Sequence, residues 1–143
     1  MSSVPFHYVD LRAFCYATED ERRVESALRT YLPDEYPIER AESEGHYGDR
    51  IVVLSARVEN ADEVRHVLSK VATLSDIDDV RAELDDRVDD NCSFFLTFDK
   101  QAAFDGRVEL GPGITLRAKV EAYPAKKDKA VENAREALSD LGE

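Results

Sequence analysis

A single stretch near the C-terminal end limits the folds that this chain can adopt. From Ile114 to Tyr123 every second residue is apolar, and Pro124 follows at once. Strict alternation predicts a β-strand with one face on a core and the other in contact with solvent. Proline cannot donate to a central ladder, so we expect the strand to end before Pro124. The chain must therefore contain a sheet with one buried and one exposed face.

The exposed positions of this strand and the turn after it carry positive charge. Between Arg117 and Lys129 there are five basic and two acidic residues, a net charge of +3 within a chain of net charge −12. A local excess of cations on an open strand face favours contact with a polyanion. We therefore expect Lys119, Lys126 and Lys127 to contribute to an anion-binding surface together with Arg117.

A second alternating stretch lies at residues 6–17. One set of its residues is mostly apolar, and His7 is its first member. The other set is mainly aromatic and consists of Phe6, Tyr8, Asp10, Arg12, Phe14 and Tyr16. Rings beside an arginine on an open sheet face can stack on bases and reach phosphates, which makes Arg12 a candidate contact. Burial on both faces, or an interface, is the alternative interpretation for Phe6 and Phe14.

Capping residues followed by apolar residues at helical spacing predict the helices. Thr18 is expected to cap a helix that runs to about Leu32, Asn60 a second helix, and Ser75 a third helix that extends toward Asn91. A last apolar face at helical spacing follows the lysines near the C-terminus.

The order of the elements predicts an α+β domain. Further strands are expected at 37–43, 51–58, 92–98 and 107–110, the last in a hairpin with the strand from Ile114. This order is typical of a single mostly antiparallel sheet with helices on one face, and 143 residues suit one domain, 1–143. The uncovered face would collect Tyr8, Arg12, Arg57, Phe95, Thr97, Arg117, Lys119 and Tyr123.

A tight reversal is predicted between the strands 37–43 and 51–58. Gly45 and Gly48 flank His46 and Tyr47, and Arg50 follows. These letters match a phosphate-clamping GxxG loop, but that loop joins two helices, whereas this one precedes a strand. A turn needs the glycines but not an exposed histidine–tyrosine pair. His46, Tyr47 and Arg50 are therefore candidate contacts at the tip of a hairpin.

The sequence contains no recognisable catalytic or metal-binding motif. It lacks a phosphate loop and a GxSxG elbow. Acidic pairs such as Asp85-Asp86 are interpreted as a solvated helix face, because adjacent helical residues do not face each other. Cys15 and Cys92 form no zinc spacing with the three histidines, so two reduced core thiols are expected. We expect no catalytic residue, no cofactor and no metal.

The strongly acidic composition has two interpretations. The chain has 31 acidic and 19 basic residues, spread over expected helix faces and turns, as is typical of proteins in a salt-rich cytosol. Ordinary surface acidity is the alternative. No apolar run approaches a membrane span, and the first residues lack the pattern of a secretory signal. We expect a cytoplasmic protein without a membrane partner.

A resemblance to a known family is carried by HYVDLRAFCYATEDE, ERAESEGHYGDRI, FDKQAA and ITLRAKVEAYPAKK. These stretches resemble an archaeal family of small RNA-binding proteins, described as predicted exosome-associated subunits. The resemblance runs from about His7 to Leu138, and the acidic version resembles the haloarchaeal branch. It implies a fold like that of the large-subunit ribosomal protein that holds the 5S rRNA. It implies no catalytic residue.

The residues and the resemblance together predict a non-enzymatic RNA-binding protein. The expected partners are RNA of structured or ribosomal type and proteins of the exosome or another processing complex. The candidate contacts are Arg12, His46, Tyr47, Arg50, Lys100, Arg117, Lys119, Lys126 and Lys127. The alternative is an interaction module, such as a homodimer joined through Phe6, Phe14 and Phe95 on the open sheet face. RNA binding requires the cations to converge on one surface rather than to be neutralised singly by carboxylates.

Overall fold

A single antiparallel sheet forms the centre of the molecule. The computed structural model describes residues 5–45 and 47–141. Within them the order is β1 (Phe6–Cys15), α1 (Glu21–Arg29), β2 (Glu39–Glu44), β3 (Arg50–Val58), α2 (Ala61–Val71), α3 (Ile77–Ala82), α4 (Leu84–Arg87), β4 (Ser93–Asp99), α5 (Lys100–Phe104), β5 (Gly113–Val120) and α6 (Lys127–Leu141). The strand order is β2-β3-β1-β5-β4, with every pair antiparallel. The predicted α+β fold is confirmed.

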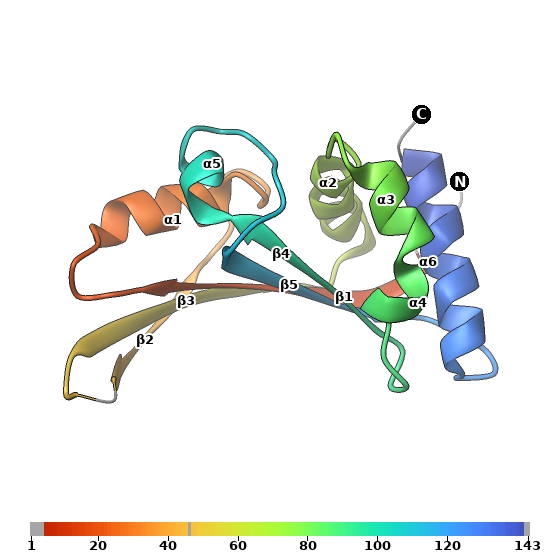
Figure 1. Cartoon of the computed structure of the whole chain (residues 1–143), viewed down its shortest axis with the longest axis horizontal. Coiled ribbons are helices and arrows are strands. Elements are labelled where there is room, and N and C mark those ends of the chain that lie inside the picture. The colour runs from red at the N-terminus through yellow and green to blue at the C-terminus, as the bar shows by residue number, and fades with distance from the viewer. Residues whose placement is uncertain (1–4, 46, 142–143) are drawn as a thin grey trace.

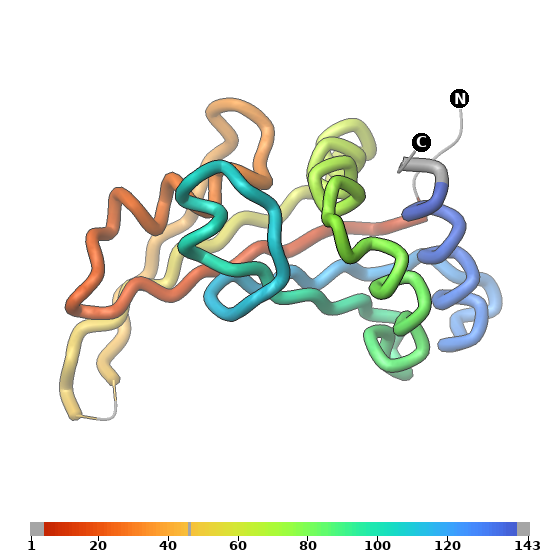
Figure 2. The backbone as a smooth tube through the Cα atoms, turned by 45° about the horizontal axis from the view of Figure 1, so that its top comes forward, coloured from red at the N-terminus to blue at the C-terminus, as the bar shows by residue number. Residues whose placement is uncertain are grey.

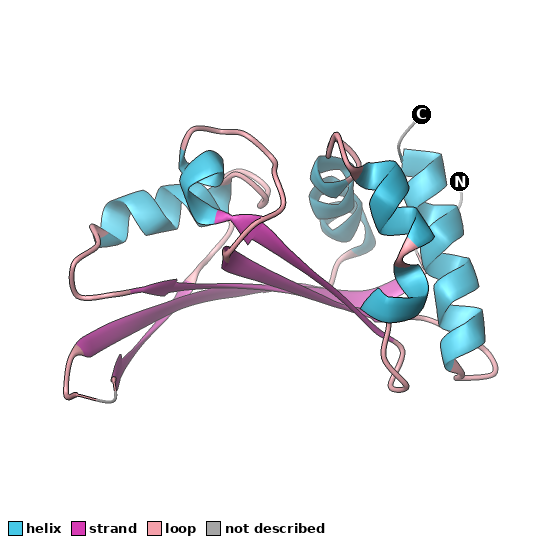
Figure 3. Ribbon diagram, viewed as in Figure 1, coloured by secondary structure: helices cyan, strands magenta, loops and turns pink. Residues whose placement is uncertain are grey.

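The helices lie over one face of this sheet (Figure 1). α1 and α5 pack together at one end, while α2, α3, α4 and α6 gather at the other. The core between the two layers contains the fully buried Leu11, Leu28, Leu68, Leu96 and Leu116. Burying each such side chain contributes about 1.5–3 kcal/mol. In Figure 3 the described helices leave most of the opposite face of the sheet uncovered.

The strand β5 has the two faces that its sequence predicts. Ile114, Leu116 and Ala118 are fully buried, whereas Thr115 and Arg117 are exposed. The ladder ends at Val120, a few residues before the proline. Because β5 lies between β1 and β4, its residues align side chains from both neighbours.

The strand β1 departs from the predicted alternation at its first residues. A register shift lies between Phe6 and Tyr8, so that Phe6 is buried and His7 is exposed, with Nδ1 of His7 3.5 Å from Oε1 of Glu121. The burial that was one interpretation of Phe6 is therefore confirmed, and its placement with the aromatic set of the open face is wrong, because the bulge turns its ring into the core. From Tyr8 onward the alternation holds, and Phe14 is partly exposed.

The helix starts agree with the predicted caps at one of three positions. Oδ1 of Asn60 accepts hydrogen bonds from N–H of Asp62 and Glu63, at 2.9 and 3.4 Å, as expected. The cap of α1 is Asp20 rather than Thr18, with Oδ1 of Asp20 accepting from N–H of Arg22 at 2.9 Å. Ser75 caps no helix, since α3 starts at Ile77 after Asp76 without a side-chain cap bond.

The segment after Ser75 forms two short helices instead of one. The residue Glu83 separates α3 from α4. The second helix ends at Arg87 because Val88 is extended and forms an isolated bridge with Phe94 of β4. The pairing of Val88 with the sheet therefore overrides the helical spacing of the sequence.

The predicted hairpin between 107–110 and the strand from Ile114 does not form. Both edges of β5 are occupied, by β1 and by β4, which leaves no edge for 107–110. The segment lies instead against the outer edge of β4, where Leu110 forms an isolated bridge with Phe98 and the carbonyl oxygen of Glu109 accepts from N–H of Asp99 at 2.8 Å. The preceding connector forms α5, with Oδ1 of Asp99 accepting from N–H of Ala102 at 2.8 Å.

Two further sequence predictions concern the cysteines and the membrane. Cys15 and Cys92 are both buried and unbridged, which confirms their assignment to the core. None of the helices in the described part of the chain combines the length and apolar character that crossing a bilayer requires.

Figure 2 shows that the turn between β2 and β3 projects from one end of the molecule.

Candidate nucleic-acid interface

The uncovered side of the sheet, which we call the open face, presents side chains in rows that cross the strands. Its residues include Tyr8, Asp10, Arg12 and Phe14 of β1, Glu39 and Ala41 of β2, Val53, Ser55 and Arg57 of β3, Phe95 and Thr97 of β4, and Thr115, Arg117 and Lys119 of β5. Strands lie about 4.8 Å apart, and alternate residues of one strand about 7 Å apart. Residues distant in the sequence are thus immediate neighbours here.

Two rows contain most of the charge. In the first, Arg57, Asp10, Arg117 and Phe95 lie opposite one another in turn. In the second, Glu39, Ser55, Arg12, Thr115 and Thr97 do the same. With Lys119, the open face holds four basic and two acidic side chains, in a chain of net charge −12. The sign of the charge is therefore reversed on this surface.

A concavity of about 530 Å³ lies at the centre of the open face. Its lining includes three arginines, Arg12, Arg57 and Arg117, beside the rings of Phe14 and Phe95. The volume is in the range of ligand sites.

The side chain of Arg57 is held in a fixed orientation. Nε and Nη2 of Arg57 lie 2.8 and 2.9 Å from the two carboxylate oxygens of Asp10. The guanidinium carbon lies 4.0 Å from the centroid of the Tyr8 ring, which is a cation–π contact. The hydrogen bonds to Asp10 raise the pKa of Arg57, so the group keeps its charge. Arg57 therefore presents a flat, oriented cation rather than a mobile one.

Arg12 and Arg117 have no such partner. Within the described residues, neither guanidinium forms a hydrogen bond, an ion pair or a ring contact. Both side chains are exposed, so their donors are available to a ligand. Lys119 is intermediate, because its Nζ donates to the carbonyl oxygen of Asn91 and keeps its other donors.

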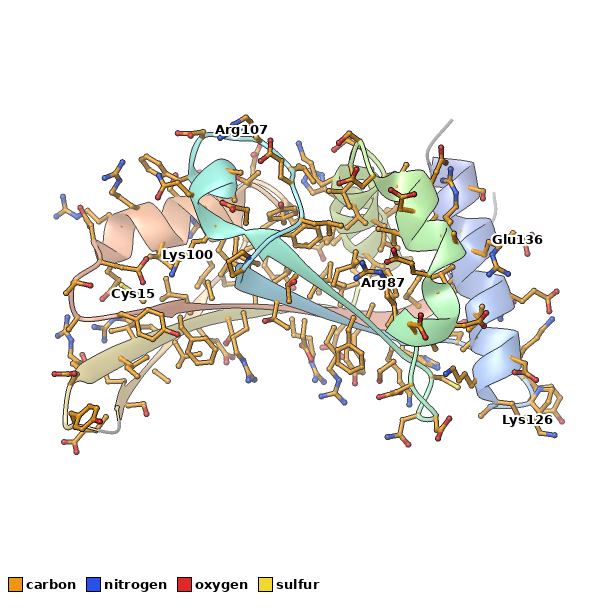
Figure 4. The ribbon with its side chains drawn as sticks, viewed as in Figure 1. Cys15, Arg87, Lys100, Arg107, Lys126 and Glu136 are labelled. Carbon is orange, nitrogen blue, oxygen red and sulfur yellow. The ribbon has the colours of Figure 1, made fainter. Side chains whose placement is uncertain are left out.

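Lys100 lies on the opposite side of the sheet, with the helices. Its Nζ is 2.8 Å from Oε1 of Glu19 and 2.8 Å from the carbonyl oxygen of Phe14. Figure 4 shows Lys100 above the sheet, near Cys15. Burial raises the pKa of Glu19, but the hydrogen bond from Lys100, the hydrogen bond from N–H of Tyr16 and the charge of Lys100 together outweigh it, and that pKa is lowered overall. The structure thus does not bring Lys100 together with the open-face arginines.

The hairpin-tip candidates lie at one end of the molecule. Tyr47 is 87% exposed. Nη1 of Arg50 lies 3.6 Å from Oε1 of Glu42, which also binds Arg40, so the charge of Arg50 is partly balanced. His46 lies outside the described residues.

The lysine candidates after β5 lie at the other end. Lys126 is exposed just before α6, as Figure 4 shows, and Lys127 begins that helix. Tyr123 follows the end of β5 and lies outside the rows of the open face. Arg12, Arg117 and Lys119 therefore form the centre of the candidate interface, whereas the hairpin and lysine candidates lie at the two ends of the molecule and outside the open face. Arg50 shares the helix-side face of β3 with the buried Val52 and Leu54.

Sequence reasoning missed the interaction of Tyr8, Asp10 and Arg57. It placed Tyr8 and Arg57 on the open face, but it could not pair Arg57 with Asp10, since the two residues are 47 positions apart. The opposite charges at exposed positions of the two strands were a signal, which becomes usable only when the register is known.

The fold and this surface define a class of protein: a single-sheet α+β domain with an open cationic face that suits a polyanion. A family model described as "RNA binding" matches residues 8–120. The chain belongs to this RNA-binding family, as the resemblance of its motifs predicted.

The relatives are archaeal. The chain is 34% identical to an RNA-binding protein of Pyrococcus abyssi, in an alignment that covers 92% of the chain and 93% of that protein. A solved structure of a protein from Archaeoglobus fulgidus has a TM-score of 0.82 at 29% identity, covering 92% of this chain and 99% of that one. The solved structure of a DUF54 protein from Methanothermobacter thermautotrophicus has a TM-score of 0.78 at 38% identity, covering 93% of this chain and 98% of that one.

Proposed function

We propose that this protein binds RNA through the open face and catalyses no reaction on it. One observation carries the proposal. Two arginines on the uncovered side of the sheet, Arg12 and Arg117, form no hydrogen bond or ion pair within the described residues. In a chain with 31 acidic residues, a guanidinium that no carboxylate binds is available to an external anion. Asp10 lies opposite Arg117, but its carboxylate oxygens accept from Arg57. Membership of the RNA-binding family and the name of the Pyrococcus relative support RNA as the anion.

Each group has a role in this proposal. Arg12, Arg117 and Lys119 bind phosphates and release counterions. The ends of the molecule extend the contact, with Tyr47 and Arg50 at the hairpin and Lys126 and Lys127 at the start of α6. His46 belongs to the hairpin group by sequence. Lys100 is left out, because its ammonium group is bound to Glu19.

The finer identity of the partners is also a proposal. RNA of structured or ribosomal type is long enough to reach both ends of the interface, and the fold is proposed to resemble the ribosomal protein that holds the 5S rRNA. The family resemblance favours attachment to the exosome or another processing complex. The acidic surface favours the cytoplasm of a salt-adapted archaeon, where electrostatic binding is weaker and stacking and hydrogen bonds carry more of the affinity.

The test is an equilibrium titration of a structured RNA at about 0.1 M and about 1 M KCl. Arg12→Gln and Arg117→Gln should each weaken binding at least fivefold at low salt and reduce the slope of log K against log salt by about 0.7–0.9. The control is Arg22→Gln, the same charge change on an exposed position of α1. A folded protein that retains no RNA at either salt concentration, or an equal loss in the control, would overturn the proposal.

A second candidate function is a homodimer joined through the open face. The rings of Phe14 and Phe95 are 37% and 38% exposed, and aromatic side chains are enriched at interfaces. Light scattering decides between the two. A tight dimer that Phe14→Lys dissociates, together with absent RNA binding, would favour the interaction module.

A further inference from the structure

Three flat groups surround the two unpaired arginines on the open face. They are the rings of Phe14 and Phe95 and the guanidinium of Arg57, and all three line the same concavity as Arg12 and Arg117. The rings are 37% and 38% exposed, and the Arg57 side chain is 51% exposed although Tyr8 covers part of it. Aromatic rings and arginine planes are the surfaces on which unpaired bases stack.

The spacing alternates flat groups with free cations. Phe14 lies two residues from Arg12 on β1, and Phe95 lies directly opposite Arg117. Arg57 is separated from Arg117 only by Asp10. Strand geometry places the Cα atoms of the three flat groups about 14–16 Å from one another, with Arg12 and Arg117 between them. A single strand of RNA has the same alternation, since a phosphate separates successive bases.

From this arrangement we infer that the open face takes unpaired, single-stranded RNA, such as a loop, a bulge or a tail, in preference to an RNA duplex. The inference rests on the proposed RNA-binding function and specifies its ligand. Bases stack on Phe14, Phe95 and Arg57, and the phosphates between them bind Arg12 and Arg117.

A duplex cannot use these groups in the same way. In an A-form helix the face of each base is covered by its neighbours, and the surface offers phosphates, sugars and a shallow minor groove. The arginines could still bind its phosphates, but the rings of Phe14 and Phe95 would gain no stacking. Affinity for a duplex would therefore come from charge alone.

The first experiment compares three labelled RNAs of one sequence by fluorescence anisotropy at the same KCl concentration. These are the unpaired oligonucleotide, the same strand annealed to its complement, and a hairpin with the sequence in its loop. Stacking of two or three bases predicts that the unpaired strand and the loop bind at least tenfold more tightly than the duplex. Equal or tighter binding of the duplex would overturn the inference.

The second experiment removes the rings but keeps apolar bulk. Phe14→Leu and Phe95→Leu should each weaken binding of the unpaired strand at least fivefold and leave duplex binding within twofold. When a 2-aminopurine base is placed in the strand, its fluorescence change on binding should be smaller with either leucine variant than with the parent protein. Tyr16→Leu is the control, since the Tyr16 ring is exposed outside the concavity, 5.4 Å from Nζ of Lys100.

The outcomes separate the two proposals. Absence of binding to every RNA by the folded protein would defeat the proposed function and the inference together. Suppose that Arg12→Gln weakens binding of both the unpaired strand and the duplex, and that the two leucine variants weaken neither. This result would leave the proposed function intact and overturn the preference for unpaired RNA. Circular dichroism and a urea titration of each variant confirm that it is folded.

Discussion

Arg40 contacts two carboxylates at once, with Nε 2.8 Å from Oε2 of Glu21 and Nη2 2.9 Å from Oε1 of Glu42. The hydrogen bonds that Arg40 donates, first to Glu21 and then to Glu42, raise the pKa of Arg40. Arg12 and Arg117 have the same side chain but form no hydrogen bond or ion pair with a carboxylate among the described residues. At the scale of the residue, the neighbouring carboxylate therefore decides whether an arginine has a structural or a binding role.

Lys100 provides a prediction at this scale. Lys100→Gln should lower the free energy of unfolding by about 1–2 kcal/mol at pH 7, because it removes a partly buried pair with Glu19, and should leave RNA affinity unchanged. The folded pKa of Glu19 lies below its ordinary value of about 4.3. A lowered folded pKa adds stability at neutral pH that is lost as the pH falls through it.

Urea titrations at pH 7 and about pH 3 check this prediction. The cost of Lys100→Gln should be smaller at the acid pH, because the stability from the pair is lost as the pH falls through the folded pKa of Glu19, and Glu19→Gln should reproduce the loss at pH 7. An equal cost at both pH values would contradict the role assigned to the ion pair.

At the scale of the element, local sequence signals were correct where no distant segment competed. Asn60 begins α2 as predicted, since its cap bonds involve only Asp62 and Glu63. Ser75 has an equally plausible cap sequence, but α3 starts two residues later, at Ile77, without a side-chain cap bond. A cap signal is thus a local preference that tertiary packing can override.

The two caps differ in a measurable way. Asn60→Ala should lower the free energy of unfolding by about 1 kcal/mol, because two N–H groups of α2 lose their acceptor. Ser75→Ala should change it by less than about 0.5 kcal/mol, because Ser75 is exposed and caps no helix. Urea midpoints of both variants provide the comparison, and a larger effect at Ser75 would contradict the structure.

The start of β5 depends on a glycine. Gly113 has φ of 128°, and a Cβ at this position would overlap the Cβ of Lys100. Gly113→Ala should therefore cost about 2–3 kcal/mol. Gly106→Ala is the matched control, with φ of 79° and open space around it, and should cost about 1 kcal/mol from backbone strain alone. Equal costs in urea titrations would show that the close approach to Lys100 has no energetic effect.

At the scale of the whole molecule, the negative charge and the cationic face respond to salt in opposite directions. The chain has 31 acidic and 19 basic residues, and the excess of negative charge repels itself in the compact state. Salt shortens the Debye length from about 10 Å at 0.1 M to about 3 Å at 1 M and screens this repulsion. The same screening weakens phosphate binding at the open face.

Raising KCl from about 0.1 M to about 1 M should therefore increase the urea midpoint while RNA affinity falls. Asp85 and Asp86 are exposed on α4 in the most acidic part of the chain. The variant Asp85→Asn/Asp86→Asn should be more stable than the parent at low salt and gain less from added KCl. A midpoint that falls with KCl would contradict this account of the charge.

The sequence by itself determined the two-faced strands, the α+β class, the cap at Asn60 and the burial of Cys15 and Cys92. These features follow from burial with period two and from bonds within one turn of helix, which neighbouring residues fix among themselves. The motifs also identified the family. The positions of Arg12, Arg117 and Lys119 on one face followed once the strands were assigned.

Only the tertiary structure decided which cations are free. It paired Arg57 with Asp10 and Lys100 with Glu19, turned Phe6 into the core and left no edge of β5 free for 107–110. Each of these outcomes depends on strand order and register, which are set by contacts between segments far apart in the chain. The physical reason is that alternation fixes the face on which a side chain lies, whereas its neighbours on that face are fixed only when the distant strands have paired.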